Sequence, residues 1–339
     1  MKALVTGAGG FLGGAIARTL RDRGDDVRGF SRGAHPELAA YGIGHHQGDV
    51  AKLDAVIEAT RGVDVVFHTA ARVGAGGRYV DFYDTNVTGT ANVLAACREC
   101  GVRALVYTST PSVVSRATDL EGVDESEDYA THFEADYGRT KAEAERLVLS
   151  STSEELNTVA LRPPIIWGPG DTSLLPRVIE RGRNGALRRI KGPPKRQDIT
   201  YIDDAVQAHL IAADLLLAGG DGARRINGRP YFVSSGEPVE VWDFVDGLLE
   251  AAGVPPVRKS VSLRTALVVG WVFEKAHTLS GAEGDPRMSR WIVRQLTSSR
   301  WFDISAARRD LGYEPRVSLE DGMRRLKAWM EEQEREPRG

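Results

Sequence analysis

Tyr137 and Lys141 lie four residues apart in DYGRTK (136–141), inside a segment whose pattern predicts a helix over 136–149. Residues at this spacing share one face of a helix. A free phenol has a pKa of about 10 and is a weak base at neutral pH. A cation about 4 Å away lowers that pKa by about three units at an effective dielectric constant near 20. The pair therefore predicts a proton donor and acceptor for a carbonyl–alcohol couple, and Lys141 can also bind the ribose hydroxyls of a cofactor. The alternative is an ordinary surface helix.

Hydroxyl side chains gather in YTSTPS (107–112), at the end of a strand predicted over 104–109. A hydroxyl at a strand end lies at the ligand edge of a parallel sheet. There it can hydrogen-bond a carbonyl oxygen and orient it toward Tyr137. The alternative is that these hydroxyls satisfy local backbone groups.

Three glycines follow the first apolar run of the chain. Residues 3–5 predict a buried strand, and residues 11–23 predict a helix that begins after Gly7 and Gly10 and contains Gly13. This spacing permits a sharp turn, a close approach of backbone N–H groups to a diphosphate, and tight helix–strand packing. A glycine triplet alone is a weak signal, but its place between strand and helix makes it specific. The alternative is a βα turn without a ligand.

Further strands and helices alternate along the first half of the chain, which predicts a Rossmann-like, doubly wound parallel sheet in an α/β fold. Such a sheet binds its ligand at the carboxyl ends of its strands, where the strand order reverses. The remaining strands are predicted over 26–30, within 42–49, and over 63–68 and 158–166, with a further helix over 84–99.

Glycine and proline become frequent after about residue 165 and the strands become short, which indicates a smaller C-terminal substrate lobe. We predict a dinucleotide-binding domain over 1–165, to which segments near 195–215 return. The discontinuous lobe occupies most of 166–330, and 331–339 is predicted to be a frayed tail.

The end of the second strand indicates which dinucleotide binds. An Asp or Glu there accepts hydrogen bonds from the adenosine ribose of NAD. This chain has Ser31 followed by Arg32, and a guanidinium pairs with a 2′-phosphate. We predict a preference for NADP(H), with NAD(H) possible. The predicted cofactor-binding residues are Gly7, Gly10, Phe11, Leu12, Gly13, Ser31, Arg32, Asp49, Val50, Ala70, Ala71, Tyr137 and Lys141.

Composition narrows the possible partners and locations. A net charge of −3 gives no reason to expect nucleic acid. The longest apolar stretch, 266–273, is too short to span a bilayer, and no leader sequence is evident, so the cytoplasm is expected. Cys97 and Cys100 are expected to be reduced thiols without a metal site. His68 is expected in the core, and His45 and His46 are expected to have no catalytic role.

The C-terminal lobe must select the substrate. Residues 261–279 mix apolar and aromatic side chains. They predict a lid over a hydrophobic substrate, or a surface that contacts a membrane or a partner enzyme; the alternative is an ordinary amphipathic helix packed on its own domain. Arg287, Arg290 and Arg294 share a helical spacing, so they face a substrate carboxylate or, alternatively, solvent.

Several ordered motifs together resemble the extended short-chain dehydrogenase/reductases. They are TGAGGFLG, YGRTK, LRPPIIWGPGD and TYIDDA, and they cover residues 1 to about 210. YTSTPSVV and the terminal SRWFDISAARRDLGYEPRVSLEDGMRR resemble the 3β-hydroxysteroid dehydrogenase/isomerase family. They are most similar to its bacterial members that reduce 2-alkyl-3-keto acids in olefin and β-lactone biosynthesis.

The resemblance implies a catalytic triad of Thr110, Tyr137 and Lys141, with Ser109 and Ser112 as substitutes for Thr110. It also implies a structural asparagine at position 86, Pro164 beside the nicotinamide, and a homodimer through the helices around 91–100 and 142–149. The expected activity is NAD(P)H-dependent interconversion of a 3-keto and a 3-hydroxy group on a hydrophobic substrate, a 2-alkyl-3-keto acid or a sterol-like molecule.

Two other functions remain open. One is a nucleotide-sugar epimerase or dehydratase that holds NAD tightly, which would favour an acidic residue after the second strand. The other is a non-catalytic dinucleotide-binding regulator, which would be expected to lack Tyr137 or Lys141.

Overall fold

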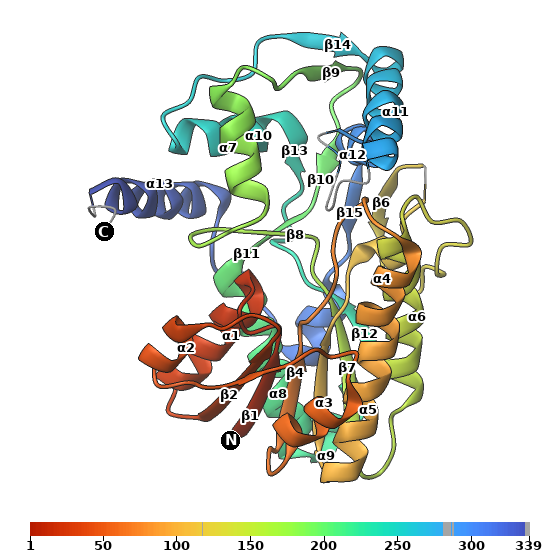
Figure 1. Ribbon diagram of the computed structural model, residues 1–339, viewed down its shortest axis with the longest axis vertical. Helices are drawn as coiled ribbons and strands as arrows, with labels where there is room; N and C mark the ends of the chain where they lie inside the picture. The colour runs from red at the N-terminus through yellow and green to blue at the C-terminus, as the bar shows by residue number, and fades with distance from the viewer. Residues whose placement is uncertain (117, 281–285, 287, 336–339) are drawn as a thin grey trace.

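The computed structural model describes residues 1–116, 118–280, 286 and 288–335. Within these residues, seven parallel strands form the main sheet in the order β12-β7-β5-β4-β1-β2-β3 (Figure 1). The strand order reverses between β1 and β4, so the predicted Rossmann-like fold is confirmed. The strands are β1 (Lys2–Thr6), β2 (Asp26–Ser31), β3 (Gly44–Gln47), β4 (Val65–His68), β5 (Ala104–Thr108), β7 (Asn157–Arg162) and β12 (Arg229–Phe232).

Helices cover both faces of this sheet, as its buried strands require. α1 (Phe11–Asp22) and α8 (Ile202–Ala218) pack together on one face. α3 (Leu53–Thr60), α5 (Gly89–Cys100) and α6 (Asp136–Ser150) lie on the other. Successive residues of β1 therefore enter different cores: Val5 packs in the cluster that contains α1 and α8, and Leu4 packs in the cluster that contains α3 and α5.

The strand predicted over 158–166 is divided in the structure. β7 stays in the main sheet, whereas β8 (Ile165–Trp167) pairs with β11 (Ile199–Tyr201) in a separate ladder. Two prolines, at positions 163 and 164, lie between β7 and β8 and have no N–H to donate to a ladder. The helix predicted over 84–99 begins with the π-helical turn η1 (Asp84–Thr88) before α5.

Elements from the second half of the chain return to the main sheet. They are α8, α9 (Gly220–Ile226) and β12, and α8 overlaps the predicted returning segment 195–215. β12 adds to the edge of β7 because its Tyr231 and Phe232 are buried in the core. β6 (Leu120–Val123) falls within the predicted first domain, but it pairs in the four-stranded sheet of the lobe. The order of that sheet is β13-β10-β15-β6.

The lobe lies beyond the carboxyl ends of the main strands (Figure 1). Trp167 anchors it through edge-on contacts with Tyr201 and Phe244. Its other elements are α7 (Leu174–Arg183), β9 (Arg189–Lys191), β10 (Arg196–Gln197), β13 (Val239–Glu240), α10 (Val241–Ala251), β14 (Ser260–Ser262), α11 (Leu263–Ser280), α12 (Arg290–Leu296), β15 (Arg300–Phe302) and α13 (Leu319–Arg335). The shorter elements α2 (Pro36–Ala40), α4 (Tyr79–Tyr83), η2 (Pro111–Val113) and η3 (Ala307–Leu311) complete the described chain.

The predicted frayed tail needs a correction. Residues 331–335 continue α13, where Arg335 pairs with Glu331 one turn earlier. The rest of the predicted tail, 336–339, lies outside the described residues.

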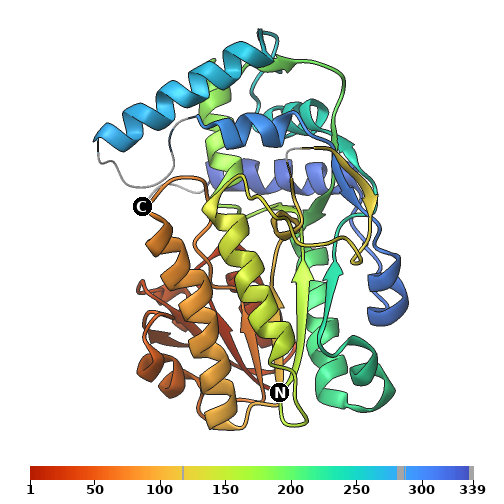
Figure 2. The ribbon, with the colours of Figure 1, turned by 90° about the vertical axis from the view of Figure 1, so that its right-hand side faces the viewer.

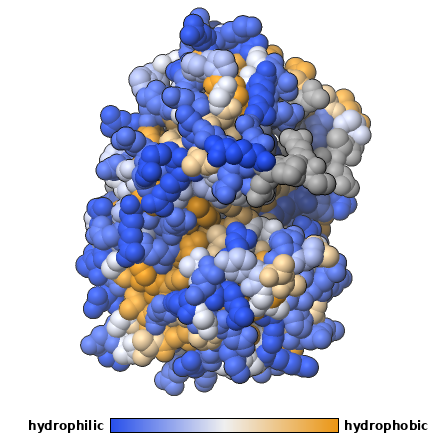
Figure 3. Space-filling model, turned by 90° about the vertical axis from the view of Figure 1, so that its left-hand side faces the viewer, coloured by the Kyte–Doolittle hydropathy of each residue, from blue (hydrophilic) through white to orange (hydrophobic). Residues whose placement is uncertain are grey.

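The molecular surface is mostly hydrophilic on the side shown in Figure 3, with apolar surface gathered around and below mid-height. A search of the described helices finds none with the length and apolar character needed to cross a bilayer.

Candidate active site

The glycine turn after β1 is packed against the end of β4, at the point where the strand order reverses. Gly7 has a φ of +73°, which favours glycine, and its N–H donates to the Phe30 carbonyl at 2.7 Å. A Cβ on Gly7 would lie 2.9 Å from the backbone of Ala70. A Cβ on Gly13 would lie 2.6 Å from Thr69 Oγ1 and would overlap the Gly7 carbonyl. The first and third glycines therefore have steric reasons to be glycine.

The start of α1 fits a dinucleotide diphosphate. Gly10 is the N-cap, no side chain caps the helix, and no acidic residue lies in its first turn. The first backbone N–H groups of a helix lack intrahelical partners and attract an anion. The half-buried Phe11 and Leu12 follow directly. The residues present at this turn therefore fit the cofactor that the sequence predicts.

The end of β2 lies beside this turn and has no carboxylate. Ser31 Oγ forms a hydrogen bond with His45 Nε2 at 2.8 Å, and the Arg32 side chain is exposed. His35 also reaches the turn, because a Cβ on Gly9 would overlap its imidazole ring. Nothing in the spacing of these residues in the sequence indicates this contact.

The other predicted cofactor residues lie at or near the same edge of the sheet. Asp49 follows β3, with Oδ1 accepting a backbone hydrogen bond, and Val50 is buried against the helix that begins at Gly89. Ala70 and Ala71 follow β4. Pro164 lies in the break between β7 and β8.

Tyr137 lies in the first turn of α6 and meets the end of β5. Gly138 allows this approach, because a Cβ there would lie 2.9 Å from the Ser112 carbonyl oxygen. Burial raises the pKa of Tyr137 to about 12, and a hydrogen bond with the Thr110 side chain acts in the opposite direction. The phenol is therefore protonated at neutral pH, which suits a proton donor.

Lys141 is 2% exposed, and its Nζ donates to the Thr108 carbonyl at 2.6 Å. The Nζ also lies 4.0 Å from the centre of the Tyr107 ring. Burial lowers the pKa of Lys141 to about 7, although the charge of Glu145 opposes this shift. In the resting structure, burial therefore outweighs the lowering of the Tyr137 pKa that we expected from Lys141. Burial dominates both groups and favours the neutral form of each.

Among the three candidate hydroxyls, Thr110 is the one whose side chain affects the pKa of Tyr137. Its Oγ1 also donates to Ser112 Oγ at 3.3 Å and accepts from the Ser112 N–H. The Ser109 hydroxyl is buried and has no hydrogen-bond partner in the described part of the chain. Thr110 is accordingly the best placed of the three to orient a carbonyl oxygen.

A buried ion pair that the sequence did not predict joins α6, the helix that carries Tyr137, to β7. Glu145 and Arg162 are 0% and 2% exposed, and Arg162 Nη2 lies 2.6 Å from Glu145 Oε1. Tyr129 donates to the same oxygen at 2.8 Å. Glu145 follows Lys141 by one helical turn, which is visible in the sequence, but its partner on β7 is not.

Two predictions about buried polar residues are consistent with the structure. His68 is fully buried between the hydroxyls of Thr6 and Thr90, and burial lowers its pKa to about 3, so it is a neutral core residue. The Asn86 side chain is hydrogen-bonded to the backbone of Arg72 and to Thr140, which is a structural arrangement.

The arginines considered for a substrate carboxylate have carboxylate partners within the chain. Arg290 Nε pairs with Glu274 at 2.7 Å, and Arg294 pairs with Glu134 at 3.3 Å. Glu134 also pairs with Arg300. Both arginines are therefore paired within the chain, and the partner of Arg294 precedes Tyr137 by three residues. Arg287 lies outside the described residues.

The cysteines are free thiols in the structure. Cys97 is buried in the core, which raises its pKa to about 12, and Cys100 is partly buried. Across the described ranges, no three His, Cys, Asp or Glu side chains come together as metal ligands would.

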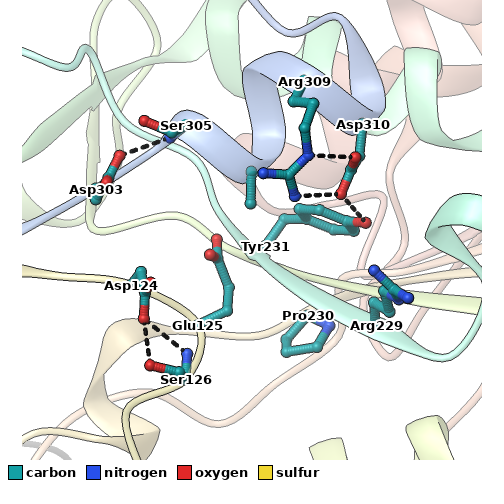
Figure 4. A pocket seen from close by; sticks show the side chains of 11 residues that line it. Asp124, Glu125, Ser126, Arg229, Pro230, Tyr231, Asp303, Ser305, Arg309 and Asp310 are labelled. Atoms are coloured by element: carbon teal, nitrogen blue, oxygen red, sulfur yellow. Dashed lines mark hydrogen bonds and ion pairs between the residues drawn. The ribbon is translucent and has the colours of Figure 1, made fainter.

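A separate pocket of about 350 Å³ lies along the edge strand β12 (Figure 4). Its walls carry four carboxylates and two arginines, and Arg309 pairs with Asp310, which also accepts from the Tyr231 hydroxyl. Glu125 accepts the Phe232 N–H and so satisfies the free edge of the strand. None of the predicted site residues lines this pocket.

Known proteins similar to this chain include the 2-alkyl-3-oxoalkanoate reductase of Stenotrophomonas maltophilia, which is 47% identical over 97% of this chain and 99% of the relative. The 3-beta-hydroxysteroid dehydrogenase of Mycolicibacterium neoaurum is 33% identical over 95% of this chain and 89% of the relative. Among solved structures, the UDP-glucuronic acid 4-epimerase of Bacillus cereus in complex with NAD has a TM-score of 0.72 at 22% identity. It covers 98% of this chain and 99% of its own, and at that identity it shows the fold alone.

The sequence profile of the 3-beta hydroxysteroid dehydrogenase/isomerase family matches residues 4–264. This range contains the glycine turn, Thr110, Tyr137 and Lys141. Together with the named relatives, the match assigns an NAD(P)-dependent dehydrogenase/reductase that interconverts keto and hydroxy groups. The chain belongs to the 3-beta hydroxysteroid dehydrogenase/isomerase family.

Proposed function

We propose that this enzyme reduces the 3-keto group of a hydrophobic 2-alkyl-3-keto acid and that Tyr137 donates the proton. The close packing of the start of α6, which carries Tyr137, on the hydroxyl-bearing segment after β5 carries the mechanistic part of the proposal. The substrate class is suggested by the name of the Stenotrophomonas maltophilia relative and by a second reductase of that name in Shewanella oneidensis, 44% identical over 96% of this chain and 85% of the relative.

A bound reduced nicotinamide supplies the hydride that the carbonyl carbon accepts. Thr110 hydrogen-bonds the carbonyl oxygen and orients it toward Tyr137. As the oxygen gains negative charge it takes the phenolic proton, so the products are the 3-hydroxy acid and the oxidised cofactor. Lys141 lies one helical turn from Tyr137, and the Thr108 carbonyl holds its Nζ in place. In its protonated form the lysine stabilises the phenolate that remains, by charge attraction.

We also propose that NADP(H) is preferred over NAD(H). The β2 end carries no carboxylate to repel a 2′-phosphate, and the exposed Arg32 guanidinium is free to pair with one. Comparison of kcat/KM for NADPH and NADH tests this point, and Arg32→Ala should lower the ratio about tenfold, which corresponds to about 1.4 kcal/mol. A wild-type enzyme that prefers NADH contradicts the proposal.

The deciding experiment measures NADPH oxidation with a panel of 2-alkyl-3-keto acids, 3-ketosteroids and nucleotide sugars, with Tyr137→Phe as the control. Turnover confined to the keto acids supports the proposal. Activity on 3-ketosteroids alone would contradict the proposed keto-acid substrate and indicate a sterol-like substrate instead. Stoichiometric NAD in the purified protein, together with activity on nucleotide sugars, supports an epimerase instead.

We further propose a homodimer through the outward faces of α5 and α6. Ala91 on α5, and Arg146 and Leu147 on α6, are exposed. Sedimentation equilibrium measures the mass in solution, and a monomer of 36.9 kDa contradicts this proposal.

A further inference from the structure

Helix α11 packs in the opposite way to an ordinary surface helix. Its two buried residues, Ala266 and Gly270, are small. A Cβ on Gly270 would lie 2.9 Å from the Arg290 backbone nitrogen, so α11 lies directly against the start of α12. Leu267 is partly buried against the core, but most of the large apolar side chains are exposed. They include Val268, Val269, Trp271, Val272, Phe273 and Leu279. A surface helix normally buries such residues.

The exposure of these side chains is substantial. Val268 is 61% exposed and Val272 is 50% exposed. Figure 2 shows α11 as the outermost helix along the upper edge of the lobe, with its C-terminal end extending past the helices beneath it. A contiguous apolar surface of this kind on a water-soluble fold marks a binding surface.

The charges on α11 indicate what binds there. Arg264, Val268, Trp271 and Lys275 follow the spacing i, i+4, i+7 and i+11, so they share one stripe about 16 Å long. A basic residue therefore lies at each end of the stripe, with apolar residues between. Both basic side chains are exposed, so their charged ends can reach lipid head groups while their stems cover apolar surface.

The only carboxylate of α11 is turned away from this stripe. Glu274 Oε1 accepts the Arg290 N–H at 2.7 Å, and Oε2 pairs with the Arg290 guanidinium. Further exposed basic residues lie near the start of the helix. Lys191 stands opposite Ser262 in the β9–β14 ladder, and Arg258 and Lys259 precede β14. The exposed face is thus apolar with a basic border.

We propose that α11 docks the enzyme onto an anionic bilayer surface, lying in the plane of the interface with its apolar face among the lipid head groups and upper acyl chains. A tryptophan, aliphatic side chains and flanking Lys or Arg are the composition of such interfacial helices. A basic border adds attraction to anionic lipids, which salt weakens. The helix lies on the membrane and does not cross it, in agreement with the absence of a spanning segment among the described helices.

Vesicle flotation with the full chain, without substrate or cofactor, tests this proposal independently of the proposed reaction. The probes are vesicles of phosphatidylcholine alone and of phosphatidylcholine mixed with phosphatidylglycerol. We expect the wild-type protein to float with the anionic vesicles and to be released by high salt. The double variant Val268→Asp/Val272→Asp should lose at least about tenfold in partitioning, and Arg264→Glu/Lys275→Glu should lose a similar factor on anionic vesicles only.

Leu53→Asp is the matched control, because Leu53 is 39% exposed on α3, in the other domain. It should float as the wild type does. Circular dichroism and NADPH-dependent activity without vesicles establish that the α11 variants fold. A wild-type protein that stays unbound overturns the proposal. A Val268→Asp/Val272→Asp variant that still floats also overturns it. The same holds if the main change in this variant is a lower mass in solution, because α11 would then be a contact between copies of the chain.

Discussion

Helices α1 and α11 both place a glycine against neighbouring backbone, yet they bury opposite kinds of side chain. α1 buries Ile16 and Leu20 as well as Gly13, so its close packing completes the core under the dinucleotide turn. α11 buries only Ala266 and Gly270 and exposes its large apolar residues. Close packing at a glycine therefore shapes the dinucleotide turn at α1, whereas at α11 it leaves the large apolar side chains exposed.

The same contrast holds for charged groups. The first domain buries them: Lys141, Glu145 and Arg162 are at most 2% exposed. The α11 region keeps its charges in water, where ion pairs contribute little. We therefore expect substitutions in the first domain to have large effects on chemistry and stability, and matched substitutions around α11 to have small ones.

The largest difference should appear in turnover. Tyr137→Phe removes the proposed proton donor, so kcat should fall by about 10²- to 10⁴-fold while NADPH still binds. Val272→Asp on α11, assayed without vesicles, should leave kcat within about twofold, because surface substitutions usually have small effects. Stopped-flow turnover and fluorescence titration of NADPH measure the two quantities. An equal loss of kcat in both variants would show that the first domain and α11 do not differ in their importance for turnover.

The next difference concerns ion pairs. Arg162→Met leaves Glu145 buried without its partner and should lower the free energy of unfolding by about 3–5 kcal/mol. Arg290→Met breaks a pair whose arginine is 50% exposed and should cost no more than about 1 kcal/mol. Urea denaturation measures both. A similar cost for the two would mean that burial does not determine the strength of these pairs.

The buried Lys141 should make the stability of the protein depend on pH. Lys141 has a pKa of about 7 in the folded protein and 10.5 ordinarily, so between these values the unfolded chain binds more protons. Wild-type stability should therefore rise with pH from about 7 to 10, relative to Lys141→Met, by up to about 1.4 kcal/mol per pH unit. Unfolding of the wild type and of Lys141→Met at a series of pH values tests this prediction. Parallel curves for the two proteins would contradict the burial of a titrating lysine.

The smallest effect is expected at the junction of α11 and α12. Glu274→Ala removes the carboxylate that accepts the Arg290 N–H at the start of α12, and loss of such a cap costs about 1 kcal/mol. Hydrogen exchange of α12 amides should become faster while exchange in α1 stays unchanged. Faster exchange throughout the chain would show that the lobe and the first domain unfold as one unit.

The sequence predicted the parts of the fold that depend on local pattern. The apolar runs and glycines of the first half predicted the parallel sheet and its turn. β12 was not predicted because its first two residues, Arg229 and Pro230, are not typical of a buried strand, and only two aromatic residues follow them. The buried side of α11 was unpredictable as well, because its apolar residues lie nearly all round the helix, and contact with α12 selects the small ones.

The candidate site was predictable in its residues but not in its electrostatics. Tyr137 and Lys141 follow from spacing, and Thr110 from a motif. The pKa shifts depend on burial, which arises only when α6 packs against β5. Arg162 was missed as the partner of Glu145 because 17 residues separate them and only the fold brings them together.

The Asn86 amide has a consequence for protein engineering. Its side chain hydrogen-bonds the backbone N–H and C=O of Arg72 and the hydroxyl of Thr140 on α6. Asn86 therefore connects the chain that leaves β4 to α6, and Arg72 is the residue of that chain to which it binds. Residues 73–78 connect Arg72 to α4, which begins at Tyr79. A variant in which only these residues are replaced keeps all three Asn86 contacts, so the chain that leaves β4 stays joined to α6.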